Sequence, residues 1–342
     1  MFRLNLSSSG ISLTRKVKRA KVSSNTINKV FEVHYNTYIK PKEVSFEERR
    51  KVALRRYNFR IFISVIIALP ILFIAMNYIM GSNSEKEQEV ISGIMILAII
   101  GAYYWCRRPV KRYNSKIKSE IFPEIFKFFG KSFSYSEKSN LDLGQLSSDS
   151  EIIPSYDNAK CEDHVTGRVG GVDLELVEAW LTERRGSGKN RRTVTVFKGL
   201  FILFSMNKDF SGKTLVKKDW GKIGNFFVGK FSRKYSNVKL EDPEFEKQFE
   251  IYASDQVEAR YLLTTSFMER LKGLSDLLAA SIQASFFDNK LMIMVNAKKN
   301  LFELSSIRRP VNFIRDVNMV LEEMKIVMQI IKELKLDQRT GL

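Results

Sequence analysis

The chain has few of the residues that build metal centres and disulfides, since its 342 residues include only two cysteines and two histidines. Cys106 ends an apolar run and Cys161 lies in a polar stretch, so the two are poorly placed for a disulfide, which a reducing cytoplasm would also disfavour. With only His34 and His164 available, a zinc site would need an unusual ligand set. We therefore expect no metal site, and no motif indicates a cofactor.

Charged residues are absent from two long apolar runs. Residues 61–80 form a run of twenty and residues 90–106 a run of seventeen, neither containing Asp, Glu, Lys or Arg. A bilayer core about 30 Å thick needs roughly 20 helical residues, with about 17 as a lower limit. The two runs therefore predict two transmembrane helices joined by a short external loop at residues 81–89.

The flanks of these runs predict the orientation. Six Lys or Arg residues lie at 49–60 and four at 107–112, whereas the loop at 81–89 has one lysine and three glutamates. Because positive charge stays on the cytoplasmic side, we expect a multi-pass protein with both termini cytoplasmic. The first apolar run begins too late for a cleaved signal peptide.

The formal net charge of +18 also has an explanation at the membrane. The anionic inner leaflet attracts each nearby Lys or Arg by about 1 kcal/mol. The lipid bilayer, including its anionic headgroups, is therefore favoured as a partner, and nucleic acid is disfavoured.

The cytoplasmic segments differ in pattern. Residues 1–25 are polar and basic, typical of a disordered arm, and residues 26–60 predict a helical segment in which Ser45–Glu48 form a capping box. Residues 107–140 predict an amphipathic juxtamembrane helix, interrupted at Pro123, and a linker.

Residues 141–342 predict an α+β domain with an antiparallel sheet, packed helices and a long C-terminal helix. Strands are expected at 172–177, 193–206, 214–217 and 249–253, with a hairpin at 281–295 that turns at Asp288–Asn289. Helices are expected at 255–263 and 266–280. The last helix has an apolar stripe: Val317, Leu321, Met324, Met328, Ile331 and Leu334.

The stretch RRGSGKNRR, residues 184–192, resembles a phosphate-binding loop but fails its requirements. Glu183 stands where the first glycine should be, Asn190 replaces the magnesium-binding hydroxyl, and a strand follows instead of a helix. The stretch predicts a hairpin tip, which is either simply solvated or in contact with lipid phosphates or an acidic partner. The candidates for that contact are Arg184, Arg185, Lys189, Arg191 and Arg192.

Residues 217–235 interleave basic and aromatic side chains and predict a long loop. Its phenylalanines could anchor the loop to the core, or the loop could lie on an anionic bilayer or stack on single-stranded nucleic acid. The candidates for lipid contact are Lys222, Phe226, Phe227 and Lys230.

Residues 239–271, KLEDPEFEKQFEIYASDQVEARYLLTTSFMERL, resemble a bacterial membrane-protein family known as domain of unknown function 3137. Residues 155–179 and 196–214 extend the resemblance, and Thr265 departs from it where proline is expected. The resemblance implies a bacterial inner-membrane protein without an established activity. An association with genes for LemA-type membrane proteins makes such a protein a candidate partner.

The signature residues predict a structural network. Asp255 and Glu258 have the spacing of a capping box, and Arg260 is expected to reach the carboxylates of Asp242 and Glu246.

An alternative is that Asp255 and Glu258 are catalytic. Asp163, His164, Asp255 and Glu258 would serve as the acid and base groups of a membrane-surface hydrolase. No activated nucleophile or oxyanion-stabilising group is recognisable beside them. We therefore expect a non-enzymatic partner-binding, scaffold or sensor module.

Overall fold

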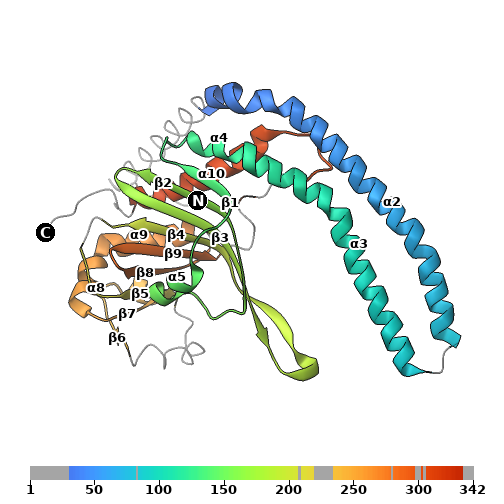
Figure 1. Cartoon of the computed structure of the whole chain (residues 1–342). Coiled ribbons are helices and arrows are strands. Elements are labelled where there is room, and N and C mark those ends of the chain that lie inside the picture. Colours follow the sequence, from blue (N-terminus) through green and yellow to red (C-terminus); the bar gives the residue numbers. More distant parts are fainter. Residues whose placement is uncertain are drawn as a thin grey trace, which may run out of the picture. The chain divides into compact units, whose positions relative to one another are not determined.

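The computed structural model describes residues 31–81, 84–206, 209–218, 234–278, 280–296, 302 and 306–333. The chain divides into two compact units (Figure 1). Unit 1 comprises Met1–Phe128 and Ser305–Arg315, and unit 2 comprises Phe129–Leu304 and Asp316–Leu342. The arm predicted at residues 1–25 lies outside the described residues.

Unit 1 is built on two long helices that lie side by side, α2 (Glu43–Gly81) and α3 (Glu85–Glu120) (Figure 1). Both are long and apolar enough to cross a membrane. No residue of the most apolar window of α2, and 6% of that of α3, is buried within the protein. An apolar helix in the core of a soluble protein would be buried instead, so this exposure favours a lipid environment.

The connections in unit 1 are more helical than the sequence predicted. The π-helical turn η1 (Tyr35–Ile39) and the 3-10 turn η2 (Lys40–Lys42) lead directly into α2. The predicted capping box at Ser45–Glu48 is therefore wrong, because Ser45 lies inside the helix, where its hydroxyl donates to the carbonyl of Lys42 (3.0 Å). The loop predicted at 81–89 is also shorter, since α3 already begins at Glu85.

The predicted interruption at Pro123 is confirmed. Helix α3 ends at Glu120, and α4 (Phe122–Lys127) begins with Pro123 in its first turn. Proline has no amide hydrogen to donate there and none is needed, because the first turn of a helix has no intrahelical acceptor.

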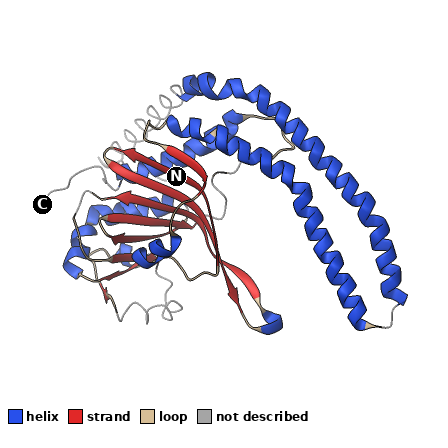
Figure 2. Cartoon of the chain, viewed as in Figure 1, coloured by secondary structure: helices blue, strands red, loops and turns tan. Residues whose placement is uncertain are grey.

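Unit 2 contains a nine-stranded antiparallel sheet in the part of the chain that the structure describes (Figure 2). The strands follow the order β1-β2-β3-β4-β9-β8-β5-β7-β6. Their bounds are β1 (Ser134–Lys138), β2 (Asn158–Val169), β3 (Val172–Arg185), β4 (Arg192–Ser205), β5 (Thr214–Lys218), β6 (Ser236–Asn237), β7 (Phe249–Ala253), β8 (Ser281–Phe287) and β9 (Lys290–Asn296).

Helices cover both faces of this sheet. Helix α5 (Leu143–Ser150) lies in front of it in Figure 1, and α9 (Thr265–Leu278) and α10 (Phe313–Glu333) lie behind it. The short helices are η3 (Gly188–Asn190), α7 (Pro243–Glu246) and α8 (Gln256–Leu262). The predicted α+β fold and long C-terminal helix are confirmed, and Val317, Leu321, Met324 and Ile331 of its stripe are buried.

The central strands are apolar because both of their faces are covered. In β9 every residue between Lys290 and Asn296 is buried. On the α5 face, Phe201 stacks on Phe197 with ring centroids 4.8 Å apart. On the opposite face, Phe267 of α9 contacts Phe286 (5.5 Å).

The start of the sheet was not predicted. Strand β1 begins at Ser134, ahead of the boundary expected at 141, and no helix or strand was predicted where α5 and β2 lie. Strand β2 has few buried positions and a break in register between Glu162 and Val165. A strand with this pattern lacks the alternation of apolar residues by which sequence identifies strands.

Candidate functional site

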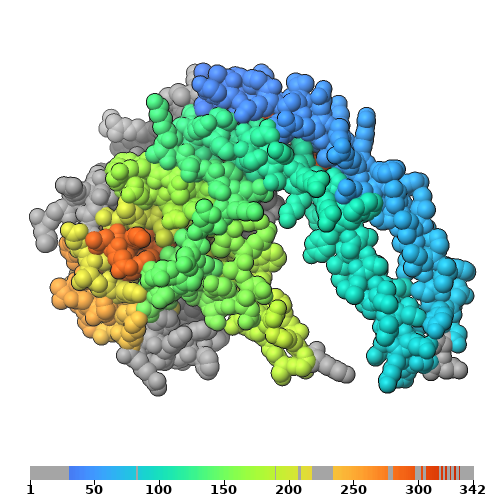
Figure 3. All heavy atoms as spheres, viewed as in Figure 1, coloured from blue at the N-terminus to red at the C-terminus, as the bar shows by residue number. Residues whose placement is uncertain are grey.

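The stretch RRGSGKNRR forms the tip of the β3–β4 hairpin, as predicted. Gly186 and Gly188 have positive φ (88° and 55°). A Cβ on Gly186 would lie 2.6 Å from the carbonyl oxygen of Asn190, so the tip needs glycine there. The hairpin projects beyond its neighbours (Figures 1 and 3) because β2 pairs with β3 only to Thr182 and β9 pairs with β4 only from Gly199.

The positive charge of this tip is largely uncompensated. Arg184, Arg191 and Arg192 are exposed, and none has an ion-pair partner within the described parts of the chain. Arg185 is neutralised locally, since its Nε donates to the Glu183 carboxylate (2.7 Å). The tip therefore presents a strong positive potential to solvent.

An exposed tryptophan shares one face of the hairpin with Arg184. Cross-strand pairing places Lys160, Trp180 and Lys198 in one row. Trp180 is 45% exposed, its indole N–H donates to the Thr195 hydroxyl (3.1 Å), and the Lys198 ammonium lies 5.6 Å from the ring centroid. Arg184 lies on the same face, four residues along the strand.

This row was not predicted, although the sequence around Trp180 indicates its exposure. It stands between Ala179 and Leu181, which are both fully buried. In a strand, neighbours of an inward-facing residue face outward, so a tryptophan at this position is displayed to solvent. The other predicted contacts, Lys222, Phe226, Phe227 and Lys230, lie outside the described residues.

The two signature carboxylates bind backbone amides. Asp255 caps helix α8 by accepting from the amides of Val257 (2.7 Å) and Glu258 (3.0 Å), as predicted. Glu258 does not complete a capping box; its carboxylate accepts from the amides of Ser211 (2.8 Å) and Gly212 (2.6 Å). Glu258 thereby connects α8 to the segment before β5.

The ion pair predicted for Arg260 is wrong. Its guanidinium donates to the carbonyls of Gln256 (3.4 Å) and Lys239 (3.5 Å), and no carboxylate pairs with it among the described residues. The expected partners bind nearby amides instead. Asp242 caps α7, and Glu246 accepts from the amide of Leu240 (2.8 Å).

The four groups of the hydrolase alternative do not come together. Asp163 and His164 lie on β2, whereas Asp255 and Glu258 follow β7, and five strands separate β2 from β7 in the sheet. At about 4.8 Å per strand, the two pairs are roughly 30 Å apart. This separation rules out a catalytic site shared by these four groups, which was the enzymatic alternative.

Asp163 and His164 have local partners. Asp163 is buried at a bulge (φ 52°) and accepts a hydrogen bond from the Tyr135 hydroxyl. Burial, followed by the charge of Asp163, raises the pKa of Tyr135 above its usual range. His164 Nε2 lies 2.8 Å from the Glu175 carboxylate, outside hydrogen-bonding angle. Within the described ranges, no cluster of three or more His, Cys, Asp or Glu side chains could hold a metal ion.

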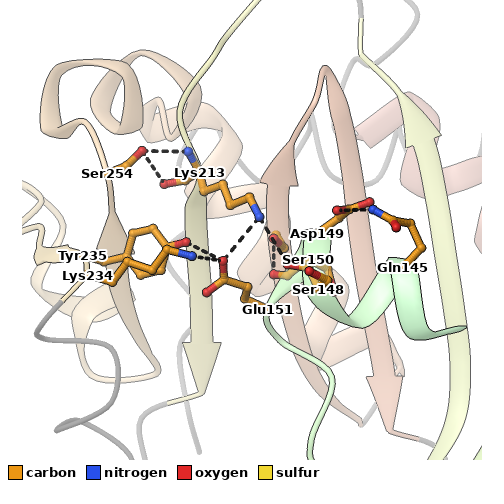
Figure 4. Close-up of polar contacts among 10 residues, drawn as sticks. Gln145, Ser148, Asp149, Ser150, Glu151, Lys213, Lys234, Tyr235 and Ser254 are labelled. Carbon is orange, nitrogen blue, oxygen red and sulfur yellow. Dashed lines mark hydrogen bonds and ion pairs between the residues drawn. The ribbon is translucent and has the colours of Figure 1, made fainter.

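Glu151 is the C-cap residue of helix α5, and its carboxylate has several hydrogen-bond partners (Figure 4). One of its oxygens accepts from Lys213 Nζ (3.3 Å), Lys234 Nζ (2.5 Å) and the Tyr235 hydroxyl (2.7 Å). Burial alone would raise the pKa of Glu151, but the hydrogen bonds from Lys234, Tyr235 and Lys213 outweigh it and lower the pKa. Glu151 therefore connects α5 to the segments that precede β5 and β6.

We expect Glu151→Gln to remove a pH-dependent part of the stability. The pKa of Glu151 is lower in the folded protein than the value of about 4.3 in an unfolded chain. Its contribution is present above that value and is lost as pH falls through the folded pKa. At pH 7 the variant should lose about 1 kcal/mol, because glutamine keeps an acceptor but no charge.

The measurement is the free energy of unfolding of both proteins between pH 7 and pH 3. The two curves should converge as the pH falls. Glu244→Gln is the matched control, since its ion pair with Lys247 is exposed (65% and 69%) and should contribute little. Parallel curves for wild type and Glu151→Gln would contradict the assignment.

A second polar cluster lies within unit 1 and connects α2 to residues 306–313. Arg50, buried at 8% exposure, donates through Nε (2.8 Å) and Nη2 (2.6 Å) to the Glu47 carboxylate and through Nη1 to the carbonyl of Ile307 (2.8 Å). Glu47 also accepts from the amide of Val311 (2.9 Å). The hydrogen bond from Arg50 outweighs burial, which would raise the pKa of Glu47, and together with the Val311 amide it lowers this pKa to about 2.

One turn earlier on α2, Glu43 extends the same arrangement. Its carboxylate accepts from the amide of Phe313 (3.1 Å), the first residue of α10, and from the Tyr35 hydroxyl (2.5 Å). The Phe313 ring packs edge-on against Phe46 (5.4 Å). We call Glu43, Glu47 and Arg50, with the backbone groups they bind, the α2 clasp.

Comparison with known proteins identifies one domain of this chain. A comparison with curated proteins finds no significant match. Among solved structures, the mycobacterial trehalose monomycolate transport factor A, TtfA, is similar at 9% identity, with 59% of this chain and 88% of that chain covered and a TM-score of 0.33. A likeness at this level supports no conclusion about fold or function. Residues 195–336 match the family model described as Protein of unknown function (DUF3137), so the chain contains a DUF3137 domain that begins near the start of β4 and includes α10.

Proposed function

We propose that this protein is anchored in the bacterial inner membrane by α2 and α3, with both termini in the cytoplasm. The apolar surface that both helices leave exposed carries this proposal. The excess of basic residues on the two flanks, and its absence from the connection, supports the orientation.

We further propose that unit 2 is a non-enzymatic partner-binding, scaffold or sensor module. Of the carboxylates that could have acted as acid and base, Asp255 caps a helix, Glu258 binds two backbone amides, and Asp163 accepts from the Tyr135 hydroxyl. The exposed feature that distinguishes unit 2 is the charged β3–β4 hairpin, which has the chemistry of a contact surface rather than of a catalytic site.

The test is affinity purification of the full chain from membranes of its native host, in parallel with a truncated chain that ends at residue 140. A partner should be retained by the full chain and lost with the truncation, and a LemA-type membrane protein is the first candidate to probe. Identical sets of retained proteins from both chains would contradict the proposal. So would turnover of a substrate by the purified full chain.

A further inference from the structure

We propose that the β3–β4 hairpin binds the anionic lipid headgroups of a bilayer through the face that carries Trp180, Lys198 and Arg184. This inference rests on the proposed membrane anchor, which would keep the hairpin close to an anionic leaflet. We call this face, together with Arg191 at the tip, the hairpin face; Arg192 pairs with Arg185 and lies on the opposite face of the hairpin.

The charge of the hairpin fits anionic headgroups. Residues 180–198 contain six basic side chains and one acidic side chain, Glu183, which pairs with Arg185. Three exposed guanidinium groups remain without an ion-pair partner in the described structure: Arg184, Arg191 and Arg192. Each basic residue near an anionic leaflet strengthens binding by about fivefold, so Arg184 and Arg191 together supply roughly 25-fold.

The tryptophan adds a preference for the bilayer surface. Trp180 has its polar N–H satisfied by Thr195, and nearly half of the residue remains exposed. Tryptophan is enriched at the level of lipid headgroups because its ring has an apolar body and a polar edge. The neighbouring Lys198 lies above the ring, where its ammonium can reach a phosphate while the ring contacts the acyl boundary.

The uncompensated charge of the hairpin face lies toward the tip. Glu162 and Glu178 form the next cross-strand row toward the centre of the sheet, and Glu162 pairs with Lys160 (2.7 Å). Past Thr182, where β2 stops pairing with β3, the hairpin projects as a two-stranded ribbon (Figure 3). Single-stranded nucleic acid would fit less well, because stacking uses a series of aromatic rings and the described part of this face has one.

The first test places the full chain, with Trp105→Phe and Trp220→Phe, in nanodiscs so that Trp180 is the remaining tryptophan. The discs contain either phosphatidylcholine alone or phosphatidylcholine with phosphatidylglycerol, both with brominated acyl chains. Emission from Trp180 should be quenched in the anionic discs, restored by high salt, and unaffected in the zwitterionic discs. Equal emission in both discs would overturn the proposal. A chain that does not enter nanodiscs would instead contradict the membrane anchor.

Two triple variants distinguish lipid contact by the hairpin from an effect of the protein's total charge. Changing Arg184, Arg191 and Arg192 to Gln should abolish the quenching. Changing three other exposed lysines to Gln, which removes the same charge elsewhere in unit 2, should leave the quenching intact; these are Lys239, Lys247 and Lys290. Equal loss in both triple variants would overturn the assignment to the hairpin.

A second measurement uses the unmodified chain. Trypsin cleavage after the arginines at the hairpin tip should be at least tenfold slower in anionic discs than in zwitterionic discs. Equal cleavage rates would contradict lipid contact. Protection by a soluble acidic polypeptide or by single-stranded DNA in zwitterionic discs, without protection by anionic lipid, would assign the face to a different partner and overturn the proposal.

Discussion

Arg50→Ala is expected to release residues 306–313 from helix α2. The substitution removes both hydrogen bonds to Glu47 and leaves the buried carbonyl of Ile307 without its donor. Breaking a buried ion pair from one side costs about 3–5 kcal/mol. We expect about 3 kcal/mol, the low end of this range, because the Glu47 side chain keeps 26% exposure.

Hydrogen exchange at the backbone reports this release directly. The amides of Val311 and Phe313 donate to Glu47 and Glu43, so they exchange only when the α2 clasp opens. A cost of about 3 kcal/mol corresponds to exchange roughly 100-fold faster.

Arg49→Ala is the matched control for this experiment. Arg49 is the preceding residue, but its ion pair with Glu120 is exposed (49% and 37%), and its guanidinium lies 4.9 Å from the Phe46 ring centroid. Interactions of this kind contribute at most about 1 kcal/mol. Similar exchange rates for Val311 and Phe313 in the two variants would show that the clasp does not hold this segment.

Phe201→Ala should destabilise unit 2 by about 3–5 kcal/mol, the usual cost of removing a buried phenylalanine. Phe201 is fully buried on β4, is paired with Val177 and Met294 on the flanking strands, and stacks on Phe197. A cavity in this position removes contacts from three adjacent strands. For a domain of this size, the loss corresponds to a melting temperature lower by about 6–20 °C.

The comparison for Phe201→Ala is Val257→Ala on helix α8, where the valine is 77% exposed. It also truncates an apolar side chain, but it opens no cavity, so its effect should stay within about 0.5 kcal/mol. Thermal unfolding of the full chain, followed by circular dichroism, measures both. Equal melting temperatures would mean that the Phe197–Phe201 stack is not part of the core.

Local residue chemistry predicted several elements well. The turn of the β8–β9 hairpin was placed at Asp288 and Asn289, which tolerate the positive φ angles found there (47° and 55°). The two apolar helices and the buried stripe of α10 were equally predictable, because the composition and spacing of apolar residues determine them.

Contacts that depend on the tertiary fold were not predictable. Arg50 and Ile307 are 257 residues apart, and the acceptor is a backbone carbonyl, which no side-chain pattern reveals. The ion pair predicted for Arg260 is wrong for a related reason. A nearby backbone carbonyl accepts from the Arg260 guanidinium, and a nearby backbone amide donates to the Glu246 carboxylate. The hydrolase alternative joined Asp163 and Asp255 by residue type alone, and the strand order, which no residue type reveals, separates them.

We propose that α2 and α3 anchor the chain in the membrane and leave unit 2 in the cytoplasm. Single cysteines test it most directly in a chain with Cys106→Ser and Cys161→Ser. One is placed by Ser84→Cys, between the two helices, and the other by Ser187→Cys, at the hairpin tip. A membrane-impermeant maleimide should label position 84 in sealed spheroplasts and position 187 only after the membrane is permeabilised. Labelling of position 187 in sealed spheroplasts, or failure to label position 84 there, would contradict the account.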